Sequence, residues 1–266
     1  MSEHTPVLTL DLSAGYHGKG EILRNIKLEI GAGEIVGLIG ESGSGKSTLT
    51  LAVLQLLFLK NGYSKGSVRL NGKELVGLSE SELRAIRGRD IGLVLQSPTS
   101  SLNPALKIGT QLYETWRAHK PGNHKECIPI FLELLRSLNL EADEKFLQHK
   151  PSQISVGQAQ RVLIAMAILH HPAVVIADEP TSALDVITQK EVLGIFRQLA
   201  RDRNIAILFV SHDLLAVSSL CDRIAILREG EIVESGPTAR VLTSPQHFYT
   251  KQLVSALPHA EFSPLR

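Results

Sequence analysis

Short, uninterrupted runs of apolar residues recur along the chain and predict buried strands. They occupy residues 35–39, 91–95, 173–177 and 205–210, and a further strand is predicted at 223–227, where four apolar residues follow Arg223. Runs of this length without polar interruption are typical of parallel strands that are covered on both faces. Apolar and polar positions alternate instead at 7–12 and 26–30, which predicts strands with one buried face.

Helical spacing of apolar residues dominates a long segment between two of these runs, residues 105–170. We therefore expect a helical lobe inserted into a strand-rich core, with helices that include residues 130–138 and 162–169. Further helices are predicted at 49–59, 80–87 and 186–201, while SPTSSLNP at 97–104 is predicted to be a loop. Apolar strands separated by helices argue for an α/β fold with a mainly parallel sheet.

Composition narrows the function classes only slightly. The chain has 266 residues, an ordinary apolar fraction of 43% and a formal net charge of +1, so no overall charge favours nucleic-acid binding. Cys127 and Cys221 lie far apart and are interpreted as reduced thiols of a cytoplasmic protein. The first residues lack a signal-peptide pattern, and the most apolar stretch is too short to span a bilayer, so any membrane role requires a partner.

A glycine-rich segment follows the first apolar run. Residues 40–48, GESGSGKST, match the phosphate-loop pattern with Gly40, Gly45, Lys46 and Ser47 at the fixed positions. Such a loop turns its N–H groups inward as an anion site, and the helix start adds a positive dipole end. Lys46 can reach the outer phosphates, and the Ser47 hydroxyl can ligate Mg²⁺. The alternative is a plain Gly/Ser loop between a core strand and a core helix.

Polar residues follow three of the predicted parallel strands, where ligands bind in such sheets. They are Gln96, the pair Asp178-Glu179, and His212. Asp178 can hold Mg²⁺ through water, Glu179 can orient an attacking water, and His212 can contact a terminal phosphate. Taken alone, the acidic pair could cap a helix and the histidine could be structural. Their meaning comes from the phosphate-loop pattern upstream.

Tyr16 lies in sequence between the two alternating segments, 24 positions before Gly40. An aromatic side chain at such a place can stack on an adenine ring. The alternative is a surface-packed aromatic residue without a ligand.

The segment ISVGQAQR at 154–161 resembles the signature of the ATP-binding cassette (ABC) family, LSGGQ followed by a Gln-Arg pair. The resemblance covers nearly the whole chain and takes in the other motifs in the family's order, including Ser182-Ala183-Leu184-Asp185. It implies a P-loop NTPase (RecA-like) core with an N-terminal antiparallel β subdomain and an inserted α-helical subdomain. The implied single ABC ATPase domain has its core at about 1–96 and 171–237, the helical subdomain at 97–170 and a tail at 238–266.

The resemblance implies ATP and Mg²⁺ as cofactors. Lys46, Gln96, Glu179 and His212 are the implied catalytic residues, and Ser47, Gln96 and Asp178 the implied Mg²⁺ ligands. The implied nucleotide-binding residues are Tyr16, Gly40, Ser42, Gly43, Ser44, Gly45, Lys46, Ser47, Thr48, Ser155, Gly157, Gln158 and Asp185.

As implied by the resemblance, the chain is the ATP-hydrolysing subunit of an importer, peripheral at the cytoplasmic face of the inner (plasma) membrane. Its partners would be two transmembrane permease subunits, a second and different ATPase chain, and an extracytoplasmic solute-binding protein, without nucleic acid. In the family, the signature of one ATPase faces the nucleotide held by the other. Val156 replaces the usual glycine of the signature, and we expect it to weaken the composite site that this signature completes.

Two segments narrow the family further. QSPTSSLNP at 96–104 and the tail pattern at 245–258 resemble the ATPases of peptide, nickel and opine-type metallophore importers. The chain stops at Arg266 without the cysteine-bearing extension frequent in peptide systems, which favours nickel or a metallophore over a shortened peptide-type subunit. Two other classes stay open: a soluble ABC ATPase acting on nucleic acid or ribosomes, and a nucleotide-binding regulator with a degenerate site.

Overall fold

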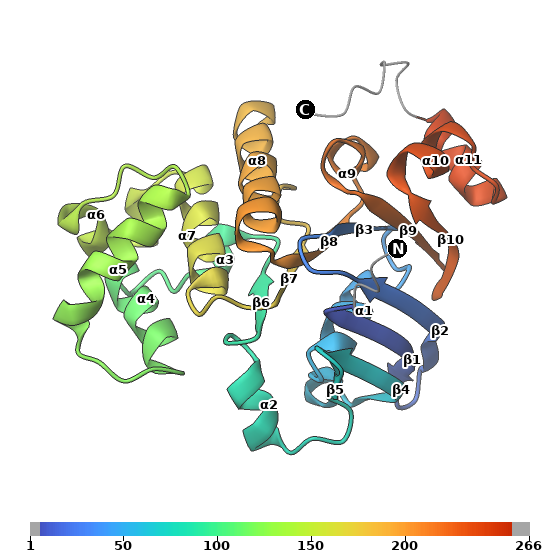
Figure 1. Ribbon diagram of the computed structural model, residues 1–266, viewed down its shortest axis with the longest axis horizontal. Coiled ribbons are helices and arrows are strands. Elements are labelled where there is room, and N and C mark those ends of the chain that lie inside the picture. Colours follow the sequence, from blue (N-terminus) through green and yellow to red (C-terminus); the bar gives the residue numbers. More distant parts are fainter. Residues whose placement is uncertain (1–5, 257–266) are drawn as a thin grey trace.

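The central element of the computed structural model, which describes residues 6–256, is a six-stranded sheet (Figure 1). Its order is β10-β9-β3-β8-β7-β6, and all neighbours are parallel except the β9–β10 hairpin. This confirms the predicted mainly parallel sheet. The strands are β3 Ile35–Ile39, β6 Ile91–Val94, β7 Val174–Asp178, β8 Ala206–Ser211, β9 Arg223–Arg228 and β10 Glu231–Pro237. Positions 257–258 of the tail pattern lie outside the described residues.

A second sheet, antiparallel throughout, is built from the N-terminal part of the chain. Its order is β2-β1-β4-β5, with β1 Leu8–Tyr16, β2 Gly20–Ile30, β4 Gly62–Leu70 and β5 Lys73–Glu74. Leu8, Leu10 and Leu12 are buried on one face of β1 while Asp11 is exposed, as the alternating pattern predicts. The first strand extends to Tyr16, so Tyr16 ends a strand rather than lying in the predicted connection.

The helices divide into those that cover the sheets and a separate group, α4 to α7, on one side of the molecule (Figure 1). This group corresponds to the predicted helical lobe. The helices are α1 Lys46–Val53, α2 Glu80–Ile86, α3 Pro98–Ser101, α4 Ile108–Arg117, α5 His124–Ser137, α6 Glu144–Gln148, α7 Val156–Ile168, α8 Val186–Arg203, α9 Leu214–Leu220, α10 Thr238–Thr243 and α11 Phe248–Ser255, with 3₁₀ turns η1 Leu57–Lys60 and η2 Pro151–Gln153. None of these helices is long and apolar enough to cross a bilayer.

The six-stranded sheet separates two hydrophobic cores. In β3, Ile35 and Ile39 pack into the core that includes α8, α9 and the helical group. Val36 and Leu38 pack into the other core, shared with α1 and the antiparallel sheet. Because both faces of the sheet are covered, the polar loops that follow the strands gather at its edge, where the strands end.

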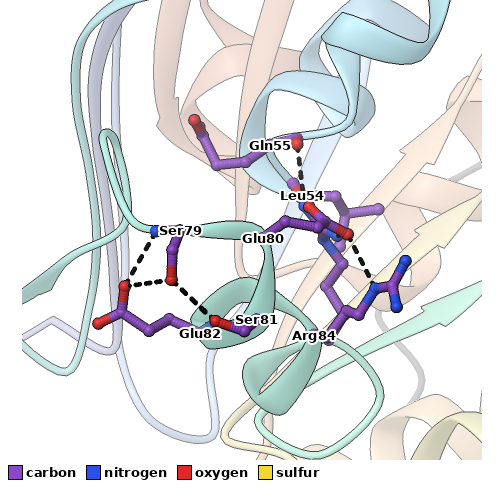
Figure 2. A network of polar contacts seen from close by, with 8 residues as sticks. Leu54, Gln55, Ser79, Glu80, Ser81, Glu82 and Arg84 are labelled. Carbon is purple, nitrogen blue, oxygen red and sulfur yellow. Dashed lines mark hydrogen bonds and ion pairs between the residues drawn. The ribbon is translucent and has the colours of Figure 1, made fainter.

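Three sequence predictions need correction. The helix predicted at 49–59 ends at Val53, because Gln55 takes a left-handed backbone with φ 52°, and residues 57–60 form a separate 3₁₀ turn. Arg87 donates to the carbonyls of Leu54 and Gln55 at 2.8 and 2.9 Å, which satisfies this helix end. Figure 2 shows these carbonyls beside the Ser79–Glu82 capping box of α2.

The other two corrections concern the signature and the loop after β6. Helix α7 starts at Val156 instead of Val162, because Ser155 caps it and the signature itself forms the first turn. The predicted loop at 97–104 contains the short helix α3, whose hydroxyls of Ser100 and Ser101 donate to the Ser97 carbonyl.

Candidate functional site

A cleft of about 780 Å³ opens where β3, β6, β7 and β8 end. It brings together residues from the phosphate loop, from both sheets and from three strand ends that are far apart in sequence. Its lining residues are Tyr16, Lys19, Ile22, Glu41, Ser42, Gly43, Gly45, Lys46, Ser47, Thr48, Gln96, Glu179 and His212. The four predicted catalytic residues are all among them.

The phosphate loop has the backbone of an anion site. Gly43 and Gly45 have φ of +85° and +112°, a region that side-chain-bearing residues rarely adopt. Helix α1 then begins at Lys46, so the N–H groups of its first turn have no partner within the helix. Free N–H groups and the positive end of a helix at one point favour a bound phosphate.

Lys46 lies inside this loop and is buried. Its ammonium donates to the carbonyls of Gly40 at 2.6 Å and Glu41 at 2.9 Å. Burial lowers the pKa of Lys46, and the nearby carboxylates of Glu179 and Asp178 oppose that shift. An ammonium has three N–H donors, so one remains for a phosphate oxygen in the cleft.

A single carboxylate oxygen joins three strand ends. Glu179 Oε2 accepts a hydrogen bond from Gln96 Nε2 at 3.0 Å and lies 3.1 Å from His212 Nδ1. The Glu179 backbone has φ 48° and its N–H donates to Val210 of the neighbouring strand β8. A non-glycine residue at positive φ is strained and is held there by its surroundings. The second carboxylate oxygen, Oε1, remains available to a water molecule.

Oxygen groups suited to Mg²⁺ lie around the same point. The Ser47 hydroxyl lines the cleft. Gln96 directs its side-chain nitrogen to Glu179, which leaves its side-chain oxygen as a potential metal ligand. Asp178 is half-buried behind the cleft lining. Burial and the adjacent Glu179 raise the pKa of Asp178, whereas Lys46 opposes the shift. This all-oxygen set fits a hard divalent cation.

Tyr16 stands at the rim of the cleft, with its hydroxyl 3.2 Å from Thr48 Oγ1. The contact ties the end of β1 to the first turn of α1. Sequence reasoning missed three lining residues nearby: Lys19, Ile22 and Glu41. A cation between two glycines, Gly18-Lys19-Gly20, was a usable signal for the first. Ile22 and Glu41 carried none.

Two predicted nucleotide-binding residues of the phosphate loop, Gly40 and Ser44, do not line the cleft. Gly40 is required for close approach, because a Cβ there would lie 2.4 Å from the Leu227 carbonyl oxygen. Ser44 is buried and faces a second, smaller cavity, and its N–H donates to Glu41. Among the described residues, both shape the loop instead of lining the cleft.

The signature residues line a different hollow of about 340 Å³, which also includes Thr188. Ser155 Oγ accepts from the Gln158 N–H at 3.2 Å, and Gln158 Oε1 accepts from the Ser155 N–H at 2.9 Å. Ser155, Gly157 and Gln158 therefore do not reach the nucleotide cleft of their own chain, which agrees with a signature that serves a second chain.

Asp185 caps helix α8. Its carboxylate accepts from the N–H groups of Ile187 and Thr188 and, at 2.7 Å, from the Thr188 hydroxyl. The hydrogen bonds from Thr188 are the main reason that the pKa of Asp185 is lowered. Its predicted nucleotide contact would therefore act through Thr188, which lies against Gly157.

Gly157→Ala tests the contact between the signature and α8. The added Cβ would lie 2.6 Å from Thr188 Cγ2, and the hydrogen bond to Asp185 resists displacement of that side chain. We expect the free energy of unfolding, measured in urea, to fall by about 1–3 kcal/mol. The double variant Gly157→Ala/Thr188→Ser removes Cγ2, keeps the hydroxyl and should recover most of the loss. No recovery would contradict the contact.

Comparisons with known proteins identify the family of the chain. Residues 23–182 match the family model described as ABC transporter. The chain is 37% identical to "Oligopeptide transport ATP-binding protein OppD" of Bacillus subtilis, over 93% of this chain and 70% of that protein. It is 38% identical to "Probable D,D-dipeptide transport ATP-binding protein DdpD" of Escherichia coli, over 92% and 75%.

A solved structure gives the same result for the fold. It is the ATP-binding cassette MJ0796, a dimer in a post-hydrolysis state bound to ADP and Pi. The TM-score is 0.73 at 30% identity, over 87% of this chain and 98% of that one. The chain therefore belongs to the ABC transporter family, and it is the ATP-hydrolysing subunit of an importer.

Proposed function

We propose that this subunit powers the uptake of small peptides and that it uses Mg²⁺ with ATP. Its proposed place is the cytoplasmic face of the inner membrane, against two permease subunits, with a second, different ATPase chain and a solute-binding protein. The observation that carries the catalytic part is the meeting of Gln96, Glu179 and His212 beside the phosphate loop. These groups match the needs of phosphoanhydride hydrolysis.

The loop amides and Lys46 bind and orient the phosphates, so that little chemistry beyond positioning and charge stabilisation is needed. Glu179 holds the attacking water through its free oxygen, and Gln96 and His212 fix the direction of that carboxylate. His212 is also placed to stabilise charge on the terminal phosphate. Bound Mg²⁺, held by Ser47, Gln96 and, through water, Asp178, would neutralise phosphate charge.

Gln96 gives this site a route to the rest of the transporter. It stands between strand β6 and the helices α3 to α7, which we propose as an inserted subdomain at 97–170, with the core at 1–96 and 171–237. A change in the cleft that releases the Gln96–Glu179 hydrogen bond frees the start of the inserted segment. Through that segment, we propose, ATP binding moves the permease subunits.

Glu179→Gln tests the proposed chemistry. The amide keeps the size of the carboxylate but loses its charge, so ATP binding should persist while hydrolysis falls by roughly 10²-fold or more. Binding and single-turnover hydrolysis would be measured on the complete transporter. Hydrolysis close to the wild-type rate would remove Glu179 from this role.

Val156 bears on the partner ATPase. It is the first residue of α7 and 40% of its surface is exposed, beside the hollow that contains Ser155 and Gly157. The helical backbone accepts valine here, so the cost falls on the nucleotide that a second chain would present to this surface. We propose that this composite site is weakened, and that the partner is a different chain with a complete signature facing this chain's cleft.

Val156→Gly should therefore raise the ATPase rate of the assembled transporter, by a few fold, because one of two sites regains room for nucleotide. The matched control is Leu215→Ala, another exposed apolar residue at a helix start that lines neither hollow. An unchanged rate in Val156→Gly would refute the proposed weakening of this composite site.

The proposed cargo rests on the similarity of the chain to proteins named for peptide transport. The names of these relatives also favour a role in transport over action on nucleic acid. The preference for nickel or a metallophore stays an untested prediction. Deletion of the gene for this chain should abolish uptake of a labelled peptide and leave ⁶³Ni uptake unchanged. Loss of nickel uptake alone would replace peptide by nickel.

A further inference from the structure

The tail motif PQHFYTKQL, at 245–253, has a structural role that the transport function does not explain. Figure 1 shows α10 and α11 beside the β9–β10 end of the six-stranded sheet. The Glu234 carboxylate of β10 accepts from the N–H groups of Gln246 and His247 at 2.8 and 2.9 Å. His247 Nδ1 in turn caps the N–H of Tyr249. These bonds fix the start of α11.

The fixed helix places Tyr249 against the back of the phosphate loop. Its side chain is buried, whereas Phe248 beside it is exposed. The guanidinium of Arg228, at the end of β9, lies 4.9 Å from the centre of the Tyr249 ring, a distance suited to a cation–π contact. Arg228 thus connects the tail to the strand that ends beside the loop.

Tyr249 and the phosphate loop share one small cavity of about 200 Å³. The loop contributes Glu41, Ser42, Gly43 and Ser44 to its wall. The hydroxyls of Tyr249 and Ser44 are both buried. The Ser44 hydroxyl has no hydrogen-bond partner within residues 6–256, whereas the Tyr249 hydroxyl lies beside Glu41, whose carboxylate and backbone are near enough to influence its pKa. Burial and the charge of Glu41 raise the pKa of Tyr249, so its hydroxyl stays a proton donor. A polar cavity of this size accommodates water that bridges such groups.

The turn between β9 and β10 supports the same side of the loop. The Gly230 N–H donates to the Ser44 carbonyl at 3.1 Å, and the Gly230 carbonyl accepts from Arg24 of β2 at 2.8 Å. A Cβ at Gly230 would overlap the carbonyl oxygen of Ile22, so the turn is packed tightly against β2. One side of the loop faces the cleft. The other side is supported by this turn and by Tyr249.

We propose that Tyr249 is a positioning residue for ATP binding, which holds the phosphate loop from behind through the cavity that it shares with Ser44 and Glu41. The C-terminal segment thereby sets nucleotide affinity, although it does not touch the nucleotide cleft. The inference rests on the proposed binding of ATP phosphates by this loop.

Tyr249→Phe tests the proposal, because it removes the hydroxyl and keeps the ring against Arg228. The Kd of the purified full chain for a fluorescent, non-hydrolysable ATP analogue should rise about fivefold, the effect of one lost hydrogen bond. In the complete transporter, KM for ATP should rise similarly, with kcat unchanged. Tyr113→Phe is the matched control, since its hydroxyl donates to Gly122 far from the loop, and it should bind as the wild type does.

A double-mutant cycle separates positioning from simple packing. If Tyr249 acts through the shared cavity, Ser44→Ala/Tyr249→Phe should bind no more weakly than the weaker single variant. Strictly additive losses of binding free energy in the double variant would overturn the inference. A wild-type Kd for Tyr249→Phe would do the same, whatever the melting temperature of that variant. A wild-type chain that fails to bind the analogue would instead refute the proposed nucleotide site.

Discussion

The site depends on one shared interaction, in which Gln96 and His212 contact the same carboxylate oxygen of Glu179. Each residue ends a different strand, so the contact requires the parallel register of β6, β7 and β8. Because these contacts hold one carboxylate oxygen of Glu179 in place, they also fix the direction in which its other oxygen points. The strained backbone of Glu179 is kept in place by the same neighbours.

The buried charges next to it depend on one another. Burial lowers the pKa of Lys46 and raises the pKa of Asp178, and each opposes the shift of the other. Removing Lys46 would leave Asp178 half-buried beside Glu179 without the positive charge that opposes its shift, which is costly for a buried carboxylate. The carboxylates of Glu179 and Asp178, at the end of β7, thus favour the charged form of Lys46 in the phosphate loop.

The nucleotide cleft and the signature hollow are two separate surfaces of the chain. The cleft and the signature hollow have no lining residue in common. The contact of Gly157 with Thr188, which Asp185 holds, links the signature helix to α8, the helix that follows the acidic pair. The signature and the segment that follows Glu179 are therefore in direct packing contact.

The sequence by itself determined the parallel strands, the phosphate loop, the polar residues that follow the strands and the helical lobe, because these follow from local periodicity and short motifs. Tertiary structure alone decided that the helix after the loop stops at Val53, since Arg87, from α2, satisfies its end. It also decided which residues line the back of the loop. Tyr249 lies about two hundred residues from Ser44 in sequence, and no local pattern encodes a contact that arises only when β9, β10 and α11 pack together.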